Sequence, residues 1–399
     1  MTAVPAGNFT VVGGGIAGLV VARRLAMAGR SVALLEASDR LGGTVARHLV
    51  GGIDLDAGAE SFAVRGGTVA ALAREIGLGD DIVSPSPAGA WLQPATGAAL
   101  PLPATSILGI PGTPLARDVI AVIGTRAALR AQLDALIPSL WARESLTLGR
   151  LVRRRMGGAL LEKLVAPVVH GVHSAHPDDL PLDRAAPGLR AALAREGSLA
   201  AAVRYLRDAA PAGSAVAGIR GGVHRIVTEL AADLETYGVD VRLGRRVRST
   251  AGLGGTVVLA TPLEPSAGRT VVLATLVVEA PELDAAPRGS GVLVAQGAAG
   301  IRARALTHST AKWEWLRERA DGRHVLRLSY DDEPASLQEA ALADASALLG
   351  TPLPRPVDFA RAQWTRSVEG RADVGESVAG SGLAGIIAHA NAKADELLA

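Results

Sequence analysis

A short stretch near the start of the sequence has the spacing of a turn that binds a dinucleotide. It follows the apolar run "FTVV", which begins at Phe9. The residues that satisfy the pattern G-x-G-x-x-G are Gly13, Gly14, Gly15, Ile16, Ala17 and Gly18. The first glycine of this pattern permits a tight turn, the second lets the backbone approach a pyrophosphate, and the third lets a helix pack on the strand. N–H groups at the start of that helix would face the phosphates.

A carboxylate follows at the end of the next apolar run. Glu36 closes "SVALLE", roughly 20 residues after the glycines, where it can accept hydrogen bonds from ribose hydroxyls. Its charge disfavours the 2′-phosphate of NADP. Strand, glycine turn, helix and acid together predict a dinucleotide site, and the alternative is a glycine turn in an α/β core that binds no nucleotide.

Composition removes several other kinds of chemistry. The 399 residues include no cysteine, which excludes disulfides, Cys-ligated metals and a Cys nucleophile. Redox chemistry therefore needs a bound organic cofactor. The net charge of +2 provides no basic stripe for nucleic acid, and an apolar fraction of 49% suits a globular enzyme.

The surrounding elements are those of a βα framework with insertions. A helix is predicted from the glycine turn to about Gly29, and "SVALLE" forms the next strand, which completes a βαβ unit. Further helices are predicted over residues 68–81, 116–137, 147–169, 189–210, 221–238, 335–350 and 385–398. Strands are predicted over residues 239–250 and at several places between 256 and 328, whereas residues 84–114 are rich in Pro and Gly and indicate hairpins and loops.

The residues after Glu36 resemble a known signature. "EASDRLGGT" is similar to the E-x-x-x-R-x-G-G pattern of the flavin-dependent amine oxidase superfamily, in which a second glycine pair, here Gly42 and Gly43, passes close to FAD. The resemblance implies further FAD contacts from "GAES", which begins at Gly58, from a strand near Val247, and from a C-terminal glycine segment.

Longer blocks resemble one family within that superfamily, the bacterial protoporphyrinogen/coproporphyrinogen oxidases, in the form found in high-GC Gram-positive bacteria. These blocks are "LVRRRMGGALLEKLVAPVVHGVHSAHPDDL", "GIRGGVHRIVTELAADLETYGVDV" and "ALTHSTAKWEWLRERADGRHVLRLSY". The resemblance implies oxidation of coproporphyrinogen III, or of protoporphyrinogen IX, with O2 as acceptor in haem biosynthesis. It also implies that N5 of the flavin accepts the hydride, so no catalytic side chain is expected.

The same resemblance assigns contacts residue by residue. It implies that the glycine turn binds the pyrophosphate, that Glu36 and Ala37 bind the adenosine ribose, and that Trp364 lies near the flavin. The other implied cofactor residues are Gly42, Gly43, Thr44, Gly58, Ala59, Glu60, Ser61, Val247, Gly375, Glu376, Gly382, Leu383 and Ala384. Arg65 is the candidate partner of substrate carboxylates, since a guanidinium binds them bidentately, and an ordinary solvated arginine is the alternative.

Two segments are shorter than the family pattern. Only "RSTAGLGGT" separates Val247 from the next strand, and only "TRSVEGRAD" separates Trp364 from the C-terminal glycine segment. The family's tryptophan after "GE" is Ser377 here. These differences predict a wider, wetter cavity, a weaker FAD site, or a chain that no longer catalyses.

Three other patterns suggest functions that we set aside. His170, His173 and His176 could ligate a metal. On a continuous helix, however, His176 would lie six residues after His170 and would point away from the face shared by the other two. Imidazoles at the end of a helix explain the pattern better. The basic run "LVRRRMGG" would allow peripheral contact with the inner face of the cell membrane, and a solvated helix face is the simpler interpretation. Trp313 and Trp315 alternate as on one face of a strand.

The predicted fold class is α/β, with a discontinuous Rossmann-like FAD-binding domain, an inserted mixed β-sheet for substrate and a helical subdomain. FAD-binding parts are predicted at residues 8–83, 213–262 and 355–399, the helical substrate part at 84–212 and the substrate sheet at 263–354. No signal peptide or 18-residue apolar stretch is present, which predicts a cytoplasmic protein. The competing functions are another flavin oxidase, acting on an amine or a polyene, and a non-catalytic porphyrin-binding flavoprotein.

Overall fold

The computed structural model describes residues 8–64, 66–138, 145–173, 175–209, 216–264, 268–367, 370–380 and 382–399. The chain divides into two compact units. Unit 1 comprises residues 1–85, 213–273 and 361–399, and unit 2 comprises residues 86–212 and 274–360. The chain therefore leaves unit 1 and returns to it twice.

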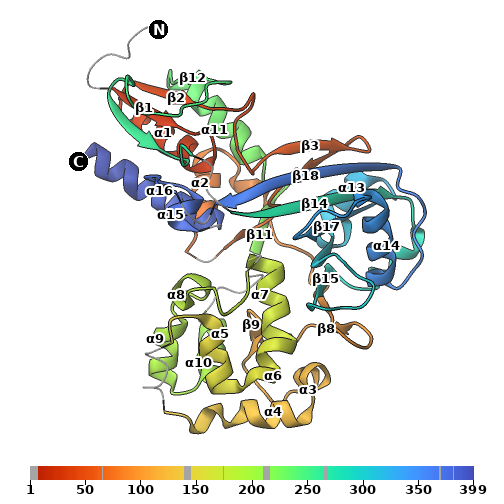
Figure 1. Cartoon of the computed structure of the whole chain (residues 1–399). Helices are drawn as coiled ribbons and strands as arrows, with labels where there is room; N and C mark the ends of the chain where they lie inside the picture. The colour runs from red at the N-terminus through yellow and green to blue at the C-terminus, as the bar shows by residue number, and fades with distance from the viewer. Residues whose placement is uncertain are drawn as a thin grey trace. The chain divides into compact units, whose positions relative to one another are not determined.

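Unit 1 is built on a parallel four-stranded sheet (Figure 1). Its strands, in spatial order, are β12 (Asp240–Arg242), β2 (Val32–Leu35), β1 (Phe9–Val12) and β13 (Thr256–Leu259). Val11 of the central strand pairs with Leu34 on one side and Val258 on the other. The strands β1 and β2 are buried along their whole length, as expected for a parallel sheet covered by helices.

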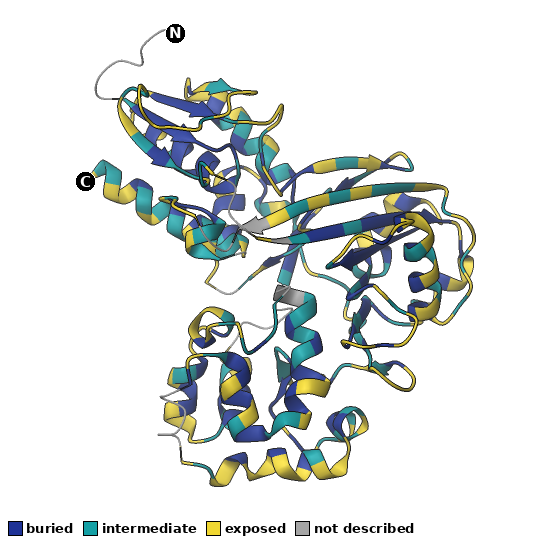
Figure 2. Cartoon of the chain, viewed as in Figure 1, coloured by how far each residue is buried: buried dark blue, intermediate teal, exposed yellow. Residues whose placement is uncertain are grey.

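Helices cover this sheet. They are α1 (Ile16–Met27), α2 (Thr68–Glu75), α11 (Arg225–Thr236), the short α15 (Glu376–Ala379) and α16 (Leu383–Leu398). Helix α1 packs against both α11 and α16, and Figure 2 shows how little of α1 is exposed. The buried guanidinium of Arg23 on α1 is held by Asp233 on α11 at 2.6 Å and by Glu75 on α2 at 3.2 Å.

Two small antiparallel sheets complete unit 1. Strands β3 (Arg47–Val50) and β4 (Ile53–Asp56) form a hairpin, and β11 (Val216–Ile219) lies between β5 (Phe62–Ala63) and β6 (Ile82–Val83). A 3₁₀ turn, Gly79–Asp81, precedes β6. These elements bring the segment after β4 back beside the central sheet.

The strand predicted over residues 239–250 is wrong beyond Arg242. The N–H of Gly244 donates to the carbonyl of Ser38 and the N–H of Arg245 to the carbonyl of Glu36. The chain therefore turns around the end of β2 instead of continuing along it. Val247 lies in the loop that follows and is half-buried.

Unit 2 contains a mixed seven-stranded sheet. Its spatial order is β18 (Asp358–Ser367), β14 (Gly268–Val278), β17 (His324–Tyr330), β16 (Ala305–His308), β15 (Gly291–Val294), β7 (Trp91–Gln93) and β8 (Leu100–Pro101). Strands β15 and β7 are parallel, whereas β15–β16, β16–β17 and β7–β8 are antiparallel. The boundaries between the units fall within β14 and β18, which carry the chain from one to the other. A 3₁₀ turn, Pro281–Leu283, follows β14.

Three helices accompany this sheet: α12 (Ser309–Lys312), α13 (Glu314–Ala320) and α14 (Leu337–Leu349). The strand suggested by Trp313 and Trp315 is wrong, because Trp315 lies in α13 and the buried Trp313 joins α12 to α13. The alternation of the two rings is outweighed by the helix-forming residues around and after them.

The rest of unit 2 is helical, with a core of its own. Its helices are α3 (Arg117–Ile123), α4 (Thr125–Gln132), α5 (Leu148–Met156), α6 (Gly158–Leu160), α7 (Ala166–His173), α8 (Leu182–Ala185), α9 (Leu189–Glu196) and α10 (Leu199–Asp208). A π-helical turn, Leu161–Val165, joins α6 to α7, a 3₁₀ turn, Leu133–Leu136, extends α4, and the short strands β9 (Ser106–Ile107) and β10 (Ile110–Pro111) pair beside them.

Three helices predicted as continuous are each divided at a glycine. Gly124, with φ of +84°, separates α3 from α4, and Gly157, with φ of +96°, separates α5 from α6. Gly197 divides the third range between α9 and α10 in the same way. A helix cannot pass through a residue with positive φ, so each glycine lets two short helices pack at an angle.

The basic run before Gly157 is not simply a solvated face. Arg155 is 1% exposed, and its Nε donates to the equally buried carboxylate of Asp134 at 2.5 Å. Its remaining donors reach four carbonyl oxygens, those of Asp134, Ile137, Pro138 and Gly197. The interpretation as a solvated helix face is therefore wrong for this arginine, which ties α5 to the 3₁₀ turn after α4. In the described part of the chain, no helix is long and apolar enough to cross a membrane.

Candidate nucleotide-binding site

The glycine turn lies between β1 and α1. The N–H of Gly13 donates to the carbonyl of Leu35 at 2.8 Å, which anchors the turn to the end of β2. A Cβ on Gly18 would collide with the carbonyl oxygen of Gly13, so only glycine lets α1 start this close to the strand. A Cβ on Gly15 would meet nothing within 4 Å. The turn is therefore tight on its protein side and open beside Gly15.

Glu36 is fixed against this turn by three hydrogen bonds. One carboxylate oxygen accepts from the N–H of Gly14 at 2.6 Å, and the other accepts from the N–H and hydroxyl of Ser38 at 2.7 and 2.8 Å. A carboxylate has about four lone-pair positions, so three donors leave about one for a further donor such as a ribose hydroxyl. Ala37 follows in an exposed position.

The second glycine pair lies directly against the first turn. The N–H of Gly42 donates to the carbonyl of Gly14 at 2.8 Å, and a Cβ on Gly43 would lie 3.4 Å from the Cα of Gly15. A Cβ on Gly58 would collide with the carbonyl oxygen of Thr44. Residues predicted from three separate stretches of sequence are therefore in contact: the second glycine pair lies against Gly14 and Gly15, and Gly58 lies against Thr44.

A fourth segment reaches the same place from the end of the chain. The N–H groups of Asp373 and Val374 donate to the carbonyl of Leu259 at 2.7 and 3.1 Å, and the carboxylate of Asp373 accepts from the N–H of Leu259 at 2.8 Å. Gly375 follows, and its Cβ would lie 3.0 Å from the carbonyl oxygen of Ala260. The C-terminal segment is thus attached to the end of β13, beside the start of α1.

The remaining predicted residues are placed less directly. Ala59, Glu60 and Ser61 continue from Gly58, Glu376 opens α15, and Gly382, Leu383 and Ala384 form the start of α16. Trp364 is half-buried on β18, and in the described part of the chain no hydrogen bond links it to the glycine turn. Arg65 lies outside the described residues.

Two anchoring carboxylates were not predicted. Besides Asp373, Asp56 at the end of β4 accepts from the N–H groups of Val223 and His224 and from the His224 ring at 2.8–2.9 Å. These three bonds fix the segment that leads to Gly58. The only signal in the sequence is that each aspartate lies two residues before a glycine of the predicted site, which is too common a pattern to indicate an anchor.

The histidines set aside in the sequence have different surroundings. His170 on α7 is bonded to Asp331 at 2.7 Å, so it is not the stray imidazole that was predicted, and His176 lies 3.5 Å from Asp178. The side chain of His173 lies outside the described residues. Among the side chains that are described, no group of three or more His, Asp or Glu could hold a metal ion.

Comparison with known proteins defines the class of this site. Residues 16–288 match the model of the flavin containing amine oxidoreductases. A coproporphyrinogen III oxidase of Mycobacterium leprae is 31% identical over 90% of this chain and 86% of its own length, and the one of Mycobacterium tuberculosis H37Rv is 30% identical over 92% and 88%. The chain therefore belongs to the coproporphyrinogen/protoporphyrinogen oxidase family within the flavin-dependent amine oxidase superfamily.

Solved structures support the same fold. A protein of Exiguobacterium sp. 255-15, whose name gives it as a candidate protoporphyrinogen oxidase, has a TM-score of 0.82 at 22% identity, with 98% of this chain and 99% of that chain covered. A putrescine oxidase has a TM-score of 0.65 at 17% identity and covers 99% of both chains. At these identities the likeness establishes the fold alone, an α/β arrangement with a parallel sheet near the N-terminus and a mixed sheet.

The flavin that the family implies fits the described residues. Helix α1 has no side-chain cap at its first turn, and the space beside Gly15 holds no protein atom within reach of a Cβ. Backbone donors, a positive helix end and open space are what a pyrophosphate requires. The carboxylate of Glu36 is set at the neighbouring strand end, where an adenosine ribose would lie.

Proposed function

We propose that this chain is an FAD-dependent oxidase that converts coproporphyrinogen III to coproporphyrin III with O2 as acceptor. The observation that carries the proposal is the alignment, over nine-tenths of the chain, with mycobacterial proteins named coproporphyrinogen III oxidase. The glycine turn between β1 and α1, together with Glu36, supports the proposal from the structure, because these residues supply a site for the cofactor that the reaction needs. Protoporphyrinogen IX is the second substrate to test.

FAD is the proposed flavin for a physical reason. The first turn, the Gly42–Thr44 loop, the segment from Gly58 and the segment at Gly375 meet in unit 1, and a cofactor buried along its length needs several backbone segments beside it. A single βαβ turn would suffice for a smaller nucleotide. We assign FAD binding to the three stretches of unit 1 and substrate binding to the sheet and helices of unit 2.

The reaction removes six electrons from the porphyrinogen in three two-electron steps. When bound, FAD supplies the hydride acceptor, and the protein contributes binding and orientation. The N–H groups at the start of α1 hold the pyrophosphate. Glu36, with Ala37, orients the ribose, and Val247 presents backbone to the adenine. Gly58, Ala59, Glu60 and Ser61 border the ring system.

Three further assignments concern the flavin ring system of the cofactor and the propionates of the substrate. The start of the helix after Gly382 would stabilise negative charge on a bound flavin through its positive end. Trp364 would border the same cofactor. Arg65 pairs with a propionate of the substrate, a role that a planar guanidinium fills better than an ammonium.

The test is a set of parallel assays on the purified, FAD-supplemented protein. Porphyrin fluorescence should rise faster than in a blank with coproporphyrinogen III, and protoporphyrinogen IX gives the preference between the two substrates. Hydrogen peroxide release with putrescine, together with silence on both porphyrinogens, would replace the proposal with amine oxidation. Binding of coproporphyrin without turnover of either porphyrinogen would identify a non-catalytic flavoprotein.

A further inference from the structure

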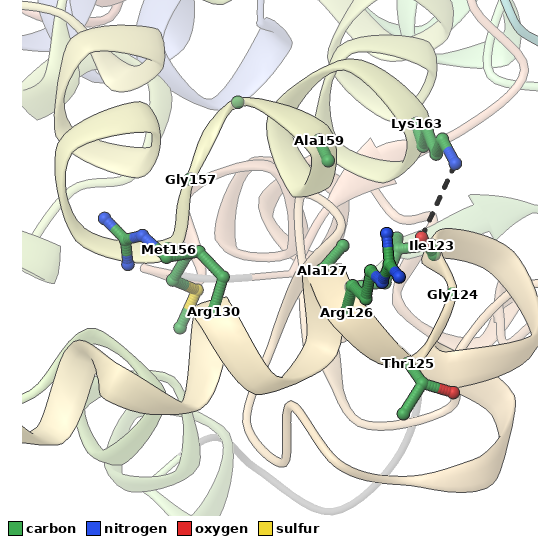
Figure 3. A pocket seen from close by; sticks show the side chains of 11 residues that line it. Ile123, Gly124, Thr125, Arg126, Ala127, Arg130, Met156, Gly157, Ala159 and Lys163 are labelled. Atoms are coloured by element: carbon green, nitrogen blue, oxygen red, sulfur yellow. Dashed lines mark hydrogen bonds between the residues drawn. The ribbon is translucent and has the colours of Figure 1, made fainter.

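A hollow lies in the helical part of unit 2, apart from every residue assigned to the cofactor. Its volume is about 560 Å³. Its lining is formed by the residues around Gly124 and Gly157, together with Arg130 and Lys163. These residues come from the end of α3, from α4, from the junction of α5 with α6 and, for Lys163, from the π-helical turn that follows α6 (Figure 3). The two helix junctions at Gly124 and Gly157 therefore create it.

Three exposed cations, Arg126, Arg130 and Lys163, border the hollow. Arg126 and Lys163 lie on its Ile123 side, and the guanidinium of Arg130 lies on the other side, over Met156 (Figure 3). The ammonium of Lys163 has only a long contact of 3.5 Å, to the carbonyl of Ile123. Arg126 has no hydrogen bond or ion pair among the described residues, and none of the described lining residues is acidic.

Arg130 is bonded to the carbonyl end of α5. Its guanidinium donates to the carbonyls of Arg155 at 2.9 Å and Arg154 at 3.1 Å, which fixes it over the end of α5. Two of its five N–H donors are used in these bonds, and three are left. A fixed guanidinium loses little conformational entropy when it binds an anion.

A helix start adds donors to the same space. Helix α4, which begins after Gly124, has no side-chain cap at its start. A Cβ on Gly124 would meet nothing within 4 Å, so the backbone there is open. These N–H groups add positive potential to the side-chain cations, although they would not define a site alone.

The rest of the lining is apolar. Ile123 and Met156 are buried, and Ala127 and Ala159 lie between them in the wall (Figure 3). A volume of 560 Å³ lies within the range that holds an organic ligand and far exceeds what a bare inorganic ion fills. Cations at the sides and methyl groups between them match a molecule with an anionic head and an apolar body.

We propose that this hollow is a second ligand site, which binds an organic anion with a carboxylate or phosphate head and a short apolar chain. The head pairs with Arg126 and Lys163, and the chain lies along Ala127 and Ala159. The site shares no residue with the proposed cofactor site.

Calorimetric titration of the full-length flavoprotein tests the proposal with three probes: hexanoate, hexyl phosphate and inorganic phosphate. At least one of the two hexyl probes should bind in a one-to-one ratio, and whichever binds tighter identifies the head group. Arg126→Gln and Lys163→Gln should each weaken binding about tenfold or more, because each removes a charge-assisted hydrogen bond. The matched control is Arg117→Gln, an exposed arginine at the far end of α3, which should leave the affinity unchanged.

Three results would overturn the proposal. The first is no heat of binding from either hexyl probe at millimolar concentration. The second is equal binding by the wild type and by the double variant R126Q/K163Q, with its melting temperature checked to show that it is folded. The third is inorganic phosphate binding as tightly as hexyl phosphate, which would show that the apolar lining contributes nothing.

Discussion

The carboxylate of Glu36 and the N–H of Gly14 are joined by a hydrogen bond of 2.6 Å. This bond links the end of β2 to the turn between β1 and α1, so the acid that would orient a ribose also fixes the backbone that would hold the pyrophosphate. A change at Glu36 should therefore affect the cofactor more than the fold, since the carboxylate is only half-buried.

Replacement of Glu36 by alanine should weaken FAD binding by about ten- to a hundredfold, since it removes a charged acceptor from both the turn and the ribose. Glu36→Gln keeps an oxygen and should lose less. Titration of the apoprotein with FAD, followed by quenching of flavin fluorescence, measures both. Glu235→Gln, an exposed glutamate on α11, is the matched control. Equal affinities for wild type and Glu36→Ala would contradict the assigned role.

Gly15 and Gly18 should respond differently to replacement by alanine. Gly15→Ala places a methyl group in open space, so the unfolding free energy of the apoprotein should change by less than about 0.5 kcal/mol, whereas FAD affinity falls. Gly18→Ala forces α1 away from Gly13 and should cost about 1–3 kcal/mol of stability. Urea unfolding and FAD titration of both variants separate the two effects. Undiminished FAD binding by Gly15→Ala would exclude a pyrophosphate beside that residue.

Part of this site could be predicted from the sequence because its signals are local. The strand, the glycine turn, the helix and Glu36 are near neighbours in the chain, and each residue type has a direct backbone reason. The approach of Gly42 to Gly14 and of Gly375 to Ala260 was available only through a family resemblance, since no local pattern states which distant segments will meet. Asp56 and Asp373 had no such signal and were missed.

Helices were predicted for the helical part of unit 2, but their division into shorter helices at glycines was not. Hydrophobic periodicity runs through Gly124 and Gly157 without interruption, because a glycine is compatible with a helix until its φ becomes positive. The buried state of Arg155 was missed for a related reason: its partner Asp134 lies on another element, and a basic run next to apolar residues usually indicates a solvated face.

Arg155→Gln should lower the free energy of unfolding by about 3–5 kcal/mol, because it leaves the carboxylate of Asp134 buried without its cation. The control is Arg150→Gln in the same helix, directly before the basic run. Its side chain is exposed, and the change should stay within about 0.5 kcal/mol. Chemical denaturation of the two variants gives the comparison, and equal losses would refute the distinction between them.

A buried histidine pair in unit 2 should make stability depend on pH. His308 and His324 share a hydrogen bond of 3.0 Å, and burial, with the neighbouring His324 ring, lowers the pKa of His308 from 6.5 to about 3. Between these values the unfolded chain binds a proton that the native chain does not. Stability should therefore fall as pH decreases below 6.5, by up to roughly 1.4 kcal/mol per pH unit from this group.

The variant His308→Gln isolates this contribution. Its unfolding free energy should change less between pH 6.5 and 5 than that of the wild type, although it is less stable at pH 7 because a buried partner of His324 is replaced. Denaturation curves at half-unit pH intervals provide the comparison. Identical slopes in the two proteins would show that His308 takes up no additional proton on unfolding in this range.

The central claim is that the cofactor site of unit 1 serves porphyrinogen oxidation. The most direct measurement is the visible spectrum of the purified protein, followed in the same cuvette by anaerobic addition of coproporphyrinogen III. We predict flavin absorption that bleaches on mixing and returns when O2 is admitted. A protein that carries no flavin and takes up no added FAD, or one whose flavin bands persist with the porphyrinogen present, would contradict the account.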